Sequence, residues 1–147
     1  LEIKDKNILI DTGGNMFSDY NIAQNKLIPY FKSLGIKKLN YLILTHGDYD
    51  HMGESINLIN EFKVDNVIFN HDNYNDLELD LIKVLDNENI NYYQNIESLN
   101  INNNKLYFLN NKLYNNENDN SNIIYTEING IRILLMGDAG VAAEKIY

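Results

Sequence analysis

The stretch YLILTHGDYDHMG, Tyr41 to Gly53, joins an apolar run to a crowded set of histidine and aspartate side chains. Tyr41 to Leu44 has the composition of a buried β-strand. Directly after it, two histidines and two aspartates fall within His46 to His51. In α/β folds, ligands bind in the loops at the carboxyl ends of strands. The stretch therefore predicts a strand that delivers a candidate site at its end.

The spacing of these four side chains suits metal binding. An extended loop points residues i and i+2 the same way, so His46 and Asp48 can reach one ion together. Asp50 and His51 lie further on and can serve a second ion about 3.5 to 4 Å away, as in two-metal hydrolases. The alternative interpretation makes the aspartates turn formers and the histidines a strand end and a helix start. Both interpretations stay open on these residues alone.

Composition limits the chemistry. The 147 residues fit one domain, spanning 1–147, and contain no cysteine, which excludes disulfide scaffolds, cysteine zinc sites and thiol nucleophiles. The net charge of −9 argues against a broad electrostatic grip on nucleic acid, so an anionic substrate needs a bound cation or a local basic patch. No apolar run approaches the ~20 residues that span a bilayer.

Short β-branched runs alternate with helical patterns along the chain. Strands are expected within Asn7–Asp11, Lys38–Leu44 and Val64–Phe69, and helices over Pro29–Gly35, Ile56–Phe62 and Tyr74–Glu88. Two hairpins follow, turning at Asn102–Asn104 and at Asn129-Gly130. The Asn-rich segment Asn110–Asn122 reads as an exposed loop. This order predicts a layered α/β domain.

Three stretches, in this order, resemble the metallo-β-lactamase superfamily: KNILIDTGG, the run ending in THGDYDHMG, and NDNSNIIYTEINGIRILLMGDAG. More narrowly, the chain resembles the ComEC-like branch, found in DNA-uptake competence proteins. The superfamily signature is His-x-His-x-Asp-His, and Asp48 stands here at the second histidine, as is typical of that branch. The resemblance implies an αββα sandwich. Because the full sandwich is longer than 147 residues, the chain is expected to be partial, lacking part of the C-terminal half.

The resemblance also implies roles for the site residues. His46 and Asp48 are expected to bind one ion, Asp50 and His51 a second, and Asp138 to bridge both through its two carboxylate oxygens. Asp48 and Asp50 are also the expected catalytic residues. The oxygen donor at Asp48 shifts the preference toward harder ions, so the two divalent cofactors are expected to be zinc or manganese.

Further residues match the pattern in part. Asp11 matches an aspartate that orients the ligand histidines, although before two glycines it also reads as a turn former. The branch's Asn-x-x-Ser pattern is matched by a segment whose side chains face either the metals, a substrate phosphate or solvent: Asn118, Asp119 and Ser121. His71 follows a strand and reads as a loop residue more readily than as a ligand.

The family's last motif, a histidine beyond Asp138, has no match, because no histidine follows His71. Truncation before that motif is the simpler explanation, and an incomplete site is the other. A histidine soon after Tyr147 in a longer chain would complete the second metal site.

The expected function is that of a metal-dependent hydrolase, a phosphodiesterase or nuclease that uses a two-metal-activated hydroxide during competence DNA uptake. Its partner would be DNA or another phosphodiester. The location would be membrane-associated in a ComEC-type parent and otherwise the cytoplasm. Two alternatives remain: a non-catalytic binding module, favoured by the charge of −9 and the missing histidine, and a hydrolase of small esters, lactones or thioesters. The sequence leaves the substrate, the native metal and the oligomeric state open.

Overall fold

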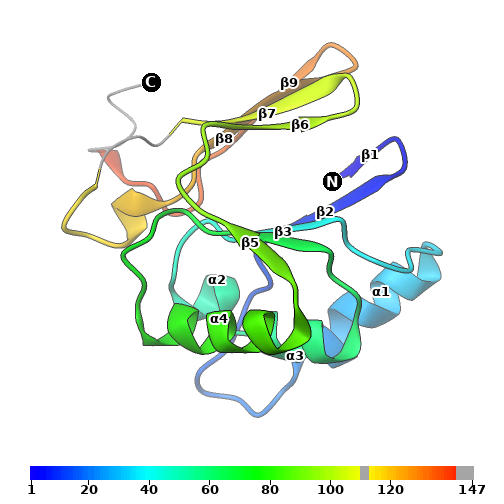
Figure 1. Ribbon diagram of the computed structural model, residues 1–147, viewed down its shortest axis with the longest axis vertical. Helices are drawn as coiled ribbons and strands as arrows, with labels where there is room; N and C mark the ends of the chain where they lie inside the picture. The colour runs from blue at the N-terminus through cyan, green and yellow to red at the C-terminus, as the bar shows by residue number, and fades with distance from the viewer. Residues whose placement is uncertain (110–112, 142–147) are drawn as a thin grey trace.

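The fold is taken from a computed structural model, which describes residues 1–109 and 113–141. Two β-sheets pack face to face, and the α-helices cover the outer face of the first sheet (Figure 1). The layers therefore run helices, sheet, sheet, and the predicted layered α/β class is confirmed. In the described part of the chain, no helix is both long and apolar enough to cross a membrane.

The first sheet brings several loops to one edge. Its order is β1-β2-β3-β4-β5, and β2 (Lys6–Ile10), β3 (Tyr41–Ile43), β4 (Asn66–Ile68) and β5 (Asn91–Tyr93) are parallel, while β1 (Glu2–Ile3) is antiparallel to β2. The last residues of three neighbouring strands are in register: Ile10 with Ile43, and Ile43 with Ile68. The loops after β2, β3 and β4 therefore leave the sheet side by side.

The second sheet is an antiparallel meander of β6 (Ser98–Ile101), β7 (Asn104–Phe108), β8 (Ile124–Ile128) and β9 (Ile131–Leu135). Both predicted hairpin turns are confirmed. Asn129 and Gly130 have φ of 53° and 79°, the left-handed pair that a type I′ turn requires. Between β7 and β8, the short 3₁₀ helix η2 (Asn118–Asn120) lies beside the end of the first sheet (Figure 1).

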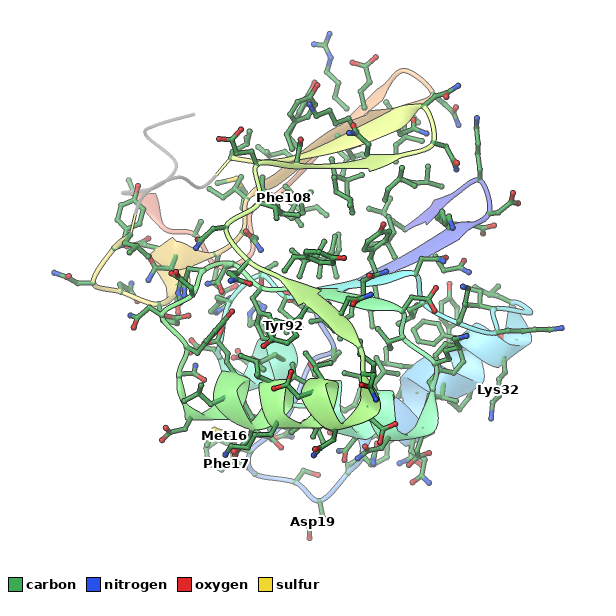
Figure 2. All side chains as sticks on the ribbon, viewed as in Figure 1. Met16, Phe17, Asp19, Lys32, Tyr92 and Phe108 are labelled. Atoms are coloured by element: carbon green, nitrogen blue, oxygen red, sulfur yellow. The ribbon has the colours of Figure 1, made fainter. Side chains whose placement is uncertain are left out.

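Two apolar cores hold the layers together. One lies between the helices and the first sheet and includes Leu42, Leu58, Val67 and Leu81. The other lies between the sheets, where Ile8, Ile43 and Ile68 meet Leu106 and Phe108. Figure 2 shows Phe108 between the two sheets and Tyr92 on the side of the helices. β3 and β4 are thus buried on both faces, which explains their continuous apolar runs.

The helices begin and end near their sequence signals. The π-helix η1 (Ala23–Leu27) runs directly into α1 (Ile28–Ser33), whose first turn holds Pro29, and Gly35 follows with φ of 72°. The predicted helix over Ile56–Phe62 is α3 (Ser55–Glu61), and α2 (Tyr49–Met52) is a single turn before it that the spacing did not predict. Short elements of this kind carry too few residues to show a period.

The segment Asn110–Asn122 differs from the prediction of an exposed loop. Asn110 to Lys112 lie outside the described residues. Asn120, Ser121 and Asn122 are buried, because their polar groups are paired with the backbone and side chains of the first sheet's loops. The prediction was wrong there because composition alone does not show that polar side chains have internal partners.

Helix α4 (Asp76–Glu88) begins with a reciprocal capping box. The Asn75 side chain accepts the backbone N–H of Glu78, and the Glu78 carboxylate accepts the backbone N–H of Asn75. Glu78 is only 1% exposed. Burial raises its pKa to about 7, the Asn75 hydrogen bond opposes this, and the charges of Glu117 and Asp48 add to it.

This pKa makes stability depend on pH. The folded pKa of Glu78 lies above the unfolded value of 4.5, so its favourable contribution is present below pH 4.5 and is lost as pH rises through about 7. Glu78→Gln keeps a capping acceptor without a charge. We therefore compare the free energy of unfolding of the metal-free variant with that of metal-free wild type. The difference in favour of the variant should be larger at pH 8 than at pH 4.5 by on the order of 1 to 3 kcal/mol.

Urea unfolding of both proteins at the two pH values measures the difference. Glu88→Gln, at the exposed end of the same helix, is the matched control and should show no such pH dependence. An equal effect of Glu78→Gln at both pH values would contradict the assignment.

Candidate metal centre

His46 is the most buried member of the predicted cluster. It lies in the loop after β3 and is 0% exposed, and its Nε2 atom is buried without a hydrogen-bond partner. Its Nδ1 atom lies 3.1 Å from the Thr45 hydroxyl and 3.3 Å from the Ser121 hydroxyl. Buried ring nitrogens are normally satisfied, so His46 Nε2 is an atom that a ligand would satisfy; among the described residues, His71 Nε2 is likewise buried without a hydrogen-bond partner.

The hydroxyl of Thr45 determines which His46 nitrogen carries the proton. Thr45 Oγ1 donates its single hydrogen to Asp11 Oδ2, 2.7 Å away. Toward His46 the oxygen can then only accept, so the hydrogen bond at 3.1 Å assigns the proton to Nδ1. The lone pair of His46 is left on Nε2, as metal coordination requires.

His51 is oriented in the same way by a carboxylate. It lies on α2, and its Nδ1 is 2.8 Å from Asp11 Oδ2, so Nδ1–H donates to Asp11. Its Nε2 lies 3.3 Å from Asp138 Oδ1. Burial lowers the pKa of His51, but the Asp11 hydrogen bond and the charges of Asp11, Asp138 and Asp50 outweigh it, and the net pKa is raised. A cation at Nε2 would relieve the same excess of negative charge.

Asp11 itself is held rigidly. It follows β2 with φ of 57°, a left-handed conformation that costs a non-glycine residue about 1 kcal/mol. Its Oδ1 accepts the Thr45 backbone N–H at 2.8 Å, and its Oδ2 accepts both the Thr45 hydroxyl and His51. These contacts are the means by which Asp11 would orient His51, and the orienting role stays a prediction.

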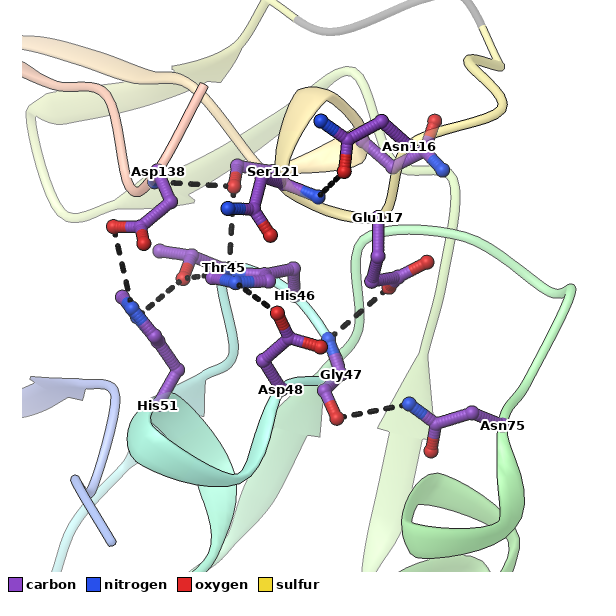
Figure 3. Close-up of polar contacts among 12 residues, drawn as sticks. Thr45, His46, Gly47, Asp48, His51, Asn75, Asn116, Glu117, Ser121 and Asp138 are labelled. Atoms are coloured by element: carbon purple, nitrogen blue, oxygen red, sulfur yellow. Dashed lines mark hydrogen bonds and ion pairs between the residues drawn. The ribbon is translucent and has the colours of Figure 1, made fainter. Parts of the chain in front are cut away.

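The ligand atoms of His46, His51 and Asp138 converge. Each offers one atom, and these atoms lie within 4.8 Å of one another. The centroids of the His46 and His51 rings are 4.2 Å apart. Asp48 Oδ2 lies 3.5 Å from His46 Nε2 (Figure 3). Two imidazole nitrogens, one of them buried without a hydrogen-bond partner, and carboxylate oxygens are a donor set that fits a divalent transition metal.

Asp50 stands apart from this group. It is exposed in the first turn of α2, and among the described residues the converging group does not include it. Its charge still acts on His51. The predicted ligand and catalytic roles of Asp50, and the catalytic role of Asp48, stay predictions.

The Asn-x-x-Ser segment supports the site from the second sheet. Ser121 Oγ lies 3.3 Å from His46 Nδ1 and accepts the Asp138 backbone N–H at 3.2 Å, so it contacts two members of the cluster. Asp119 Oδ1 accepts the Gly140 N–H at 2.9 Å and so holds the loop after Asp138. Asn118 lies in η2, and a metal- or substrate-facing role for it stays a prediction.

The approach of Asp138 depends on the glycine before it. Gly137 has φ of 55°, and a Cβ there would lie 2.9 Å from Ser121 Cβ and 3.1 Å from Thr45 Cβ. Only glycine combines this backbone conformation with this close packing. The MGD turn after β9 therefore lies directly against the loop after β3.

Sequence reasoning missed three polar residues around the site. Asn122 donates its backbone N–H to Thr45 O at 2.7 Å and its side-chain amide to Leu44 O at 3.1 Å, joining the two sheets behind His46. Asn75 and Glu117 bind the Gly47 peptide. For Asn75, the Asn-x-x-Glu capping pattern was a usable signal. In so Asn-rich a chain, nothing distinguished Asn122.

His71 follows β4 at the same sheet edge and is 4% exposed. Its Nδ1 accepts the Asn73 N–H at 3.2 Å, which places the proton on Nε2, 3.5 Å from Glu117 Oε1. It is not part of the converging group. The proton of His71 is therefore assigned to Nε2, whereas those of His46 and His51 are assigned to Nδ1.

Comparison with known proteins agrees with this geometry. Over an aligned region of 71 residues, the chain is 38% identical to ComE operon protein 3 of Bacillus subtilis (strain 168). That alignment covers 42% of this chain and 9% of the relative, so the chain spans only a small part of that protein's length. The sequence model of the metallo-beta-lactamase superfamily matches residues 1–146. A match over this range, with the sheets and the histidine-aspartate centre in place, means that the chain belongs to the metallo-β-lactamase superfamily, a group of metal-dependent hydrolases.

Proposed function

We propose that the protein is a metal-dependent phosphodiesterase, with DNA or another phosphodiester as its substrate. The observation that carries the proposal is the convergence of one ring nitrogen each of His46 and His51 with an Asp138 oxygen, with both histidine Nδ1 atoms engaged elsewhere and His51 Nε2 3.3 Å from Asp138 Oδ1. A site in which only the outward nitrogens remain available is preorganised for a cation.

We propose two divalent ions, zinc or manganese, as the cofactors. His46 with Asp48 would hold one ion, His51 with Asp50 the other, and Asp138, placed against His51, would bridge them. When bound, such ions act as Lewis acids that lower the pKa of water and polarise a phosphoryl oxygen. The chain's own residues orient the ligands: Asp11 through His51, and Thr45 and Ser121 through His46.

The phosphodiester assignment rests on charge and on the relative. The chain carries a net charge of −9, and Asp11, Asp48, Asp50 and Asp138 surround the two histidines, so bound cations are the means by which this site would hold an anionic substrate. The relative's name refers to the ComE operon, and the resemblance to DNA-uptake proteins points to DNA as the polymer. A role in competence is part of this proposal.

Removing the bridging carboxylate tests the activity. Asp138→Ala is expected to lower hydrolysis of bis(p-nitrophenyl) phosphate and of linear DNA by roughly a hundredfold or more, because it removes a metal ligand. Metal content is measured in parallel by elemental analysis after loading with zinc or manganese. Asp19→Ala, on the exposed loop between β2 and η1 (Figure 2), is the control and should keep both activity and metal.

The outcomes separate the candidate functions. Wild-type protein that binds no metal contradicts the proposal and favours a non-catalytic module. Metal-loaded protein that leaves phosphodiesters intact but hydrolyses lactones or thioesters refutes the substrate class alone.

Asp11→Asn tests the orienting role. The variant removes a negative charge beside His51, so the pKa of His51, which Asp11 helps to raise, should fall in the metal-free protein. Weaker ligand orientation should also lower metal affinity by about 10- to 100-fold. Histidine NMR titration and competition with a chromophoric chelator measure the two effects. Unchanged values in both would show that Asp11 is only a turn former.

A further inference from the structure

The backbone of Gly47 lies between two predicted ligands, and both its N–H and its carbonyl, which belong to successive peptide groups, are hydrogen-bonded (Figure 3). Its N–H donates to Glu117 Oε1 at 3.2 Å, and its carbonyl accepts the Asn75 side-chain amide at 2.8 Å. Gly47 is buried between His46 and Asp48, and Asp48 is extended, with φ of −77° and ψ of 146°. Gly47 itself lies at a bend, so holding its N–H and its carbonyl fixes the backbone that carries both neighbours.

Asn75 joins this peptide to the start of α4. Its side-chain oxygen accepts the Glu78 N–H at 2.9 Å while its side-chain nitrogen donates to Gly47 O. A capping box needs only the acceptor, so the donor is available for a second contact. Helix α4 is thereby connected rigidly to the loop after β3.

Glu117, at the N-cap of η2, accepts a hydrogen bond from the backbone N–H of Gly47. Its Oε1 faces both the Gly47 N–H and the protonated Nε2 of the buried His71 at 3.5 Å. Because His71 Nδ1 is fixed by Asn73, the imidazole presents a donor to this carboxylate. At 3.5 Å this contact is not a hydrogen bond, and His71 Nε2 is buried without a hydrogen-bond partner.

We propose that Asn75 and Glu117 are positioning residues of the metal centre. Their hydrogen bonds hold the Gly47 backbone so that His46 and Asp48 present their ligand atoms together. The inference rests on the proposed metal-binding function. Neither residue belongs to the converging ligand group, and each comes from a different element. The grip costs no entropy when the cation binds, because the fold has already ordered it.

The contact between Asn75 and the Gly47 backbone also requires that residue 47 has no side chain. A Cβ on Gly47 would collide with the Asn75 side-chain amide and lie 2.9 Å from Glu78 Cδ. Gly47→Ala should therefore push the Asn75 side chain away from the Gly47 backbone. In a double variant with Asn75→Ser the losses in metal affinity should not add, because both changes break the same contact.

Asn75→Ser separates positioning from helix capping. Serine keeps an N-cap acceptor for Glu78, but its side chain is one atom shorter and cannot span to Gly47 O. We expect zinc affinity to fall about 10-fold while the melting temperature of the metal-free protein changes little. Asn75→Ala should lose affinity to the same extent and stability in addition. Cobalt(II) d–d absorption reports whether the coordination geometry changes.

The pair Glu117→Gln and Glu117→Ala tests the other side. Glutamine keeps an acceptor for the Gly47 N–H without the charge, so it should retain most of the affinity and the cobalt spectrum, whereas alanine should lose about 10-fold. If glutamine fails as badly as alanine, Glu117 acts through its charge or as a ligand and the positioning role is refuted.

The proposed function and this inference fail in different ways. Wild-type protein that binds neither zinc nor cobalt refutes the metal-binding function itself. Wild-type protein that binds metal, with Asn75→Ser and Glu117→Ala equally tight and spectrally unchanged, refutes the positioning role and leaves the metal-binding function standing.

Discussion

The carboxylate of Asp11 is the interaction on which the site depends. It accepts the Thr45 N–H, the Thr45 hydroxyl and His51 Nδ1, at 2.7 to 2.8 Å. These bonds require β2 and β3 to lie parallel and in register, which the core on both faces of β3 enforces. One carboxylate thereby assigns the protons of both candidate ligand histidines, directly for His51 and through Thr45 for His46. The apolar core therefore sets the pairing of β2 and β3, and this pairing sets the hydrogen bonds that orient the candidate ligands.

The second sheet completes the centre. Asn122 bonds to the end of β3, Ser121 contacts both His46 and the Asp138 backbone, and Glu117 binds the Gly47 peptide. The site is thus built at the seam between two sheets that bury Ile43 and Leu106 against each other. Because the donors in this seam are mostly neutral amides and hydroxyls, the negative charge of the surrounding carboxylates stays available to a cation. Packing between the layers and ligand orientation should consequently be lost together on unfolding.

Local signals predicted much of this structure, and non-local pairing explains the rest. The apolar run at Tyr41–Leu44, the Asn129-Gly130 turn and the cluster from His46 to His51 each carry their information within a few residues. The burial of Ser121 and Asn122, and the grip on Gly47 by Asn75 and Glu117, depend on segments far apart in the chain. The spacing of apolar residues in the sequence does not predict which asparagine side chain donates to which backbone carbonyl. Asp50 directly precedes His51, yet it is exposed because of where the single turn of α2 places it. The spacing of the cluster in the sequence does not show this.

The tautomers of the histidines provide the most direct measurement, because the sequence contains only three. A long-range proton–nitrogen NMR spectrum of the metal-free protein assigns each imidazole. At a pH above the raised pKa of His51, our account predicts the proton on Nδ1 in His46 and His51 and on Nε2 in His71, with zinc shifting the Nε2 resonances of His46 and His51 alone. Nε2 protonation of His46 or His51 that persists after zinc is added would contradict it.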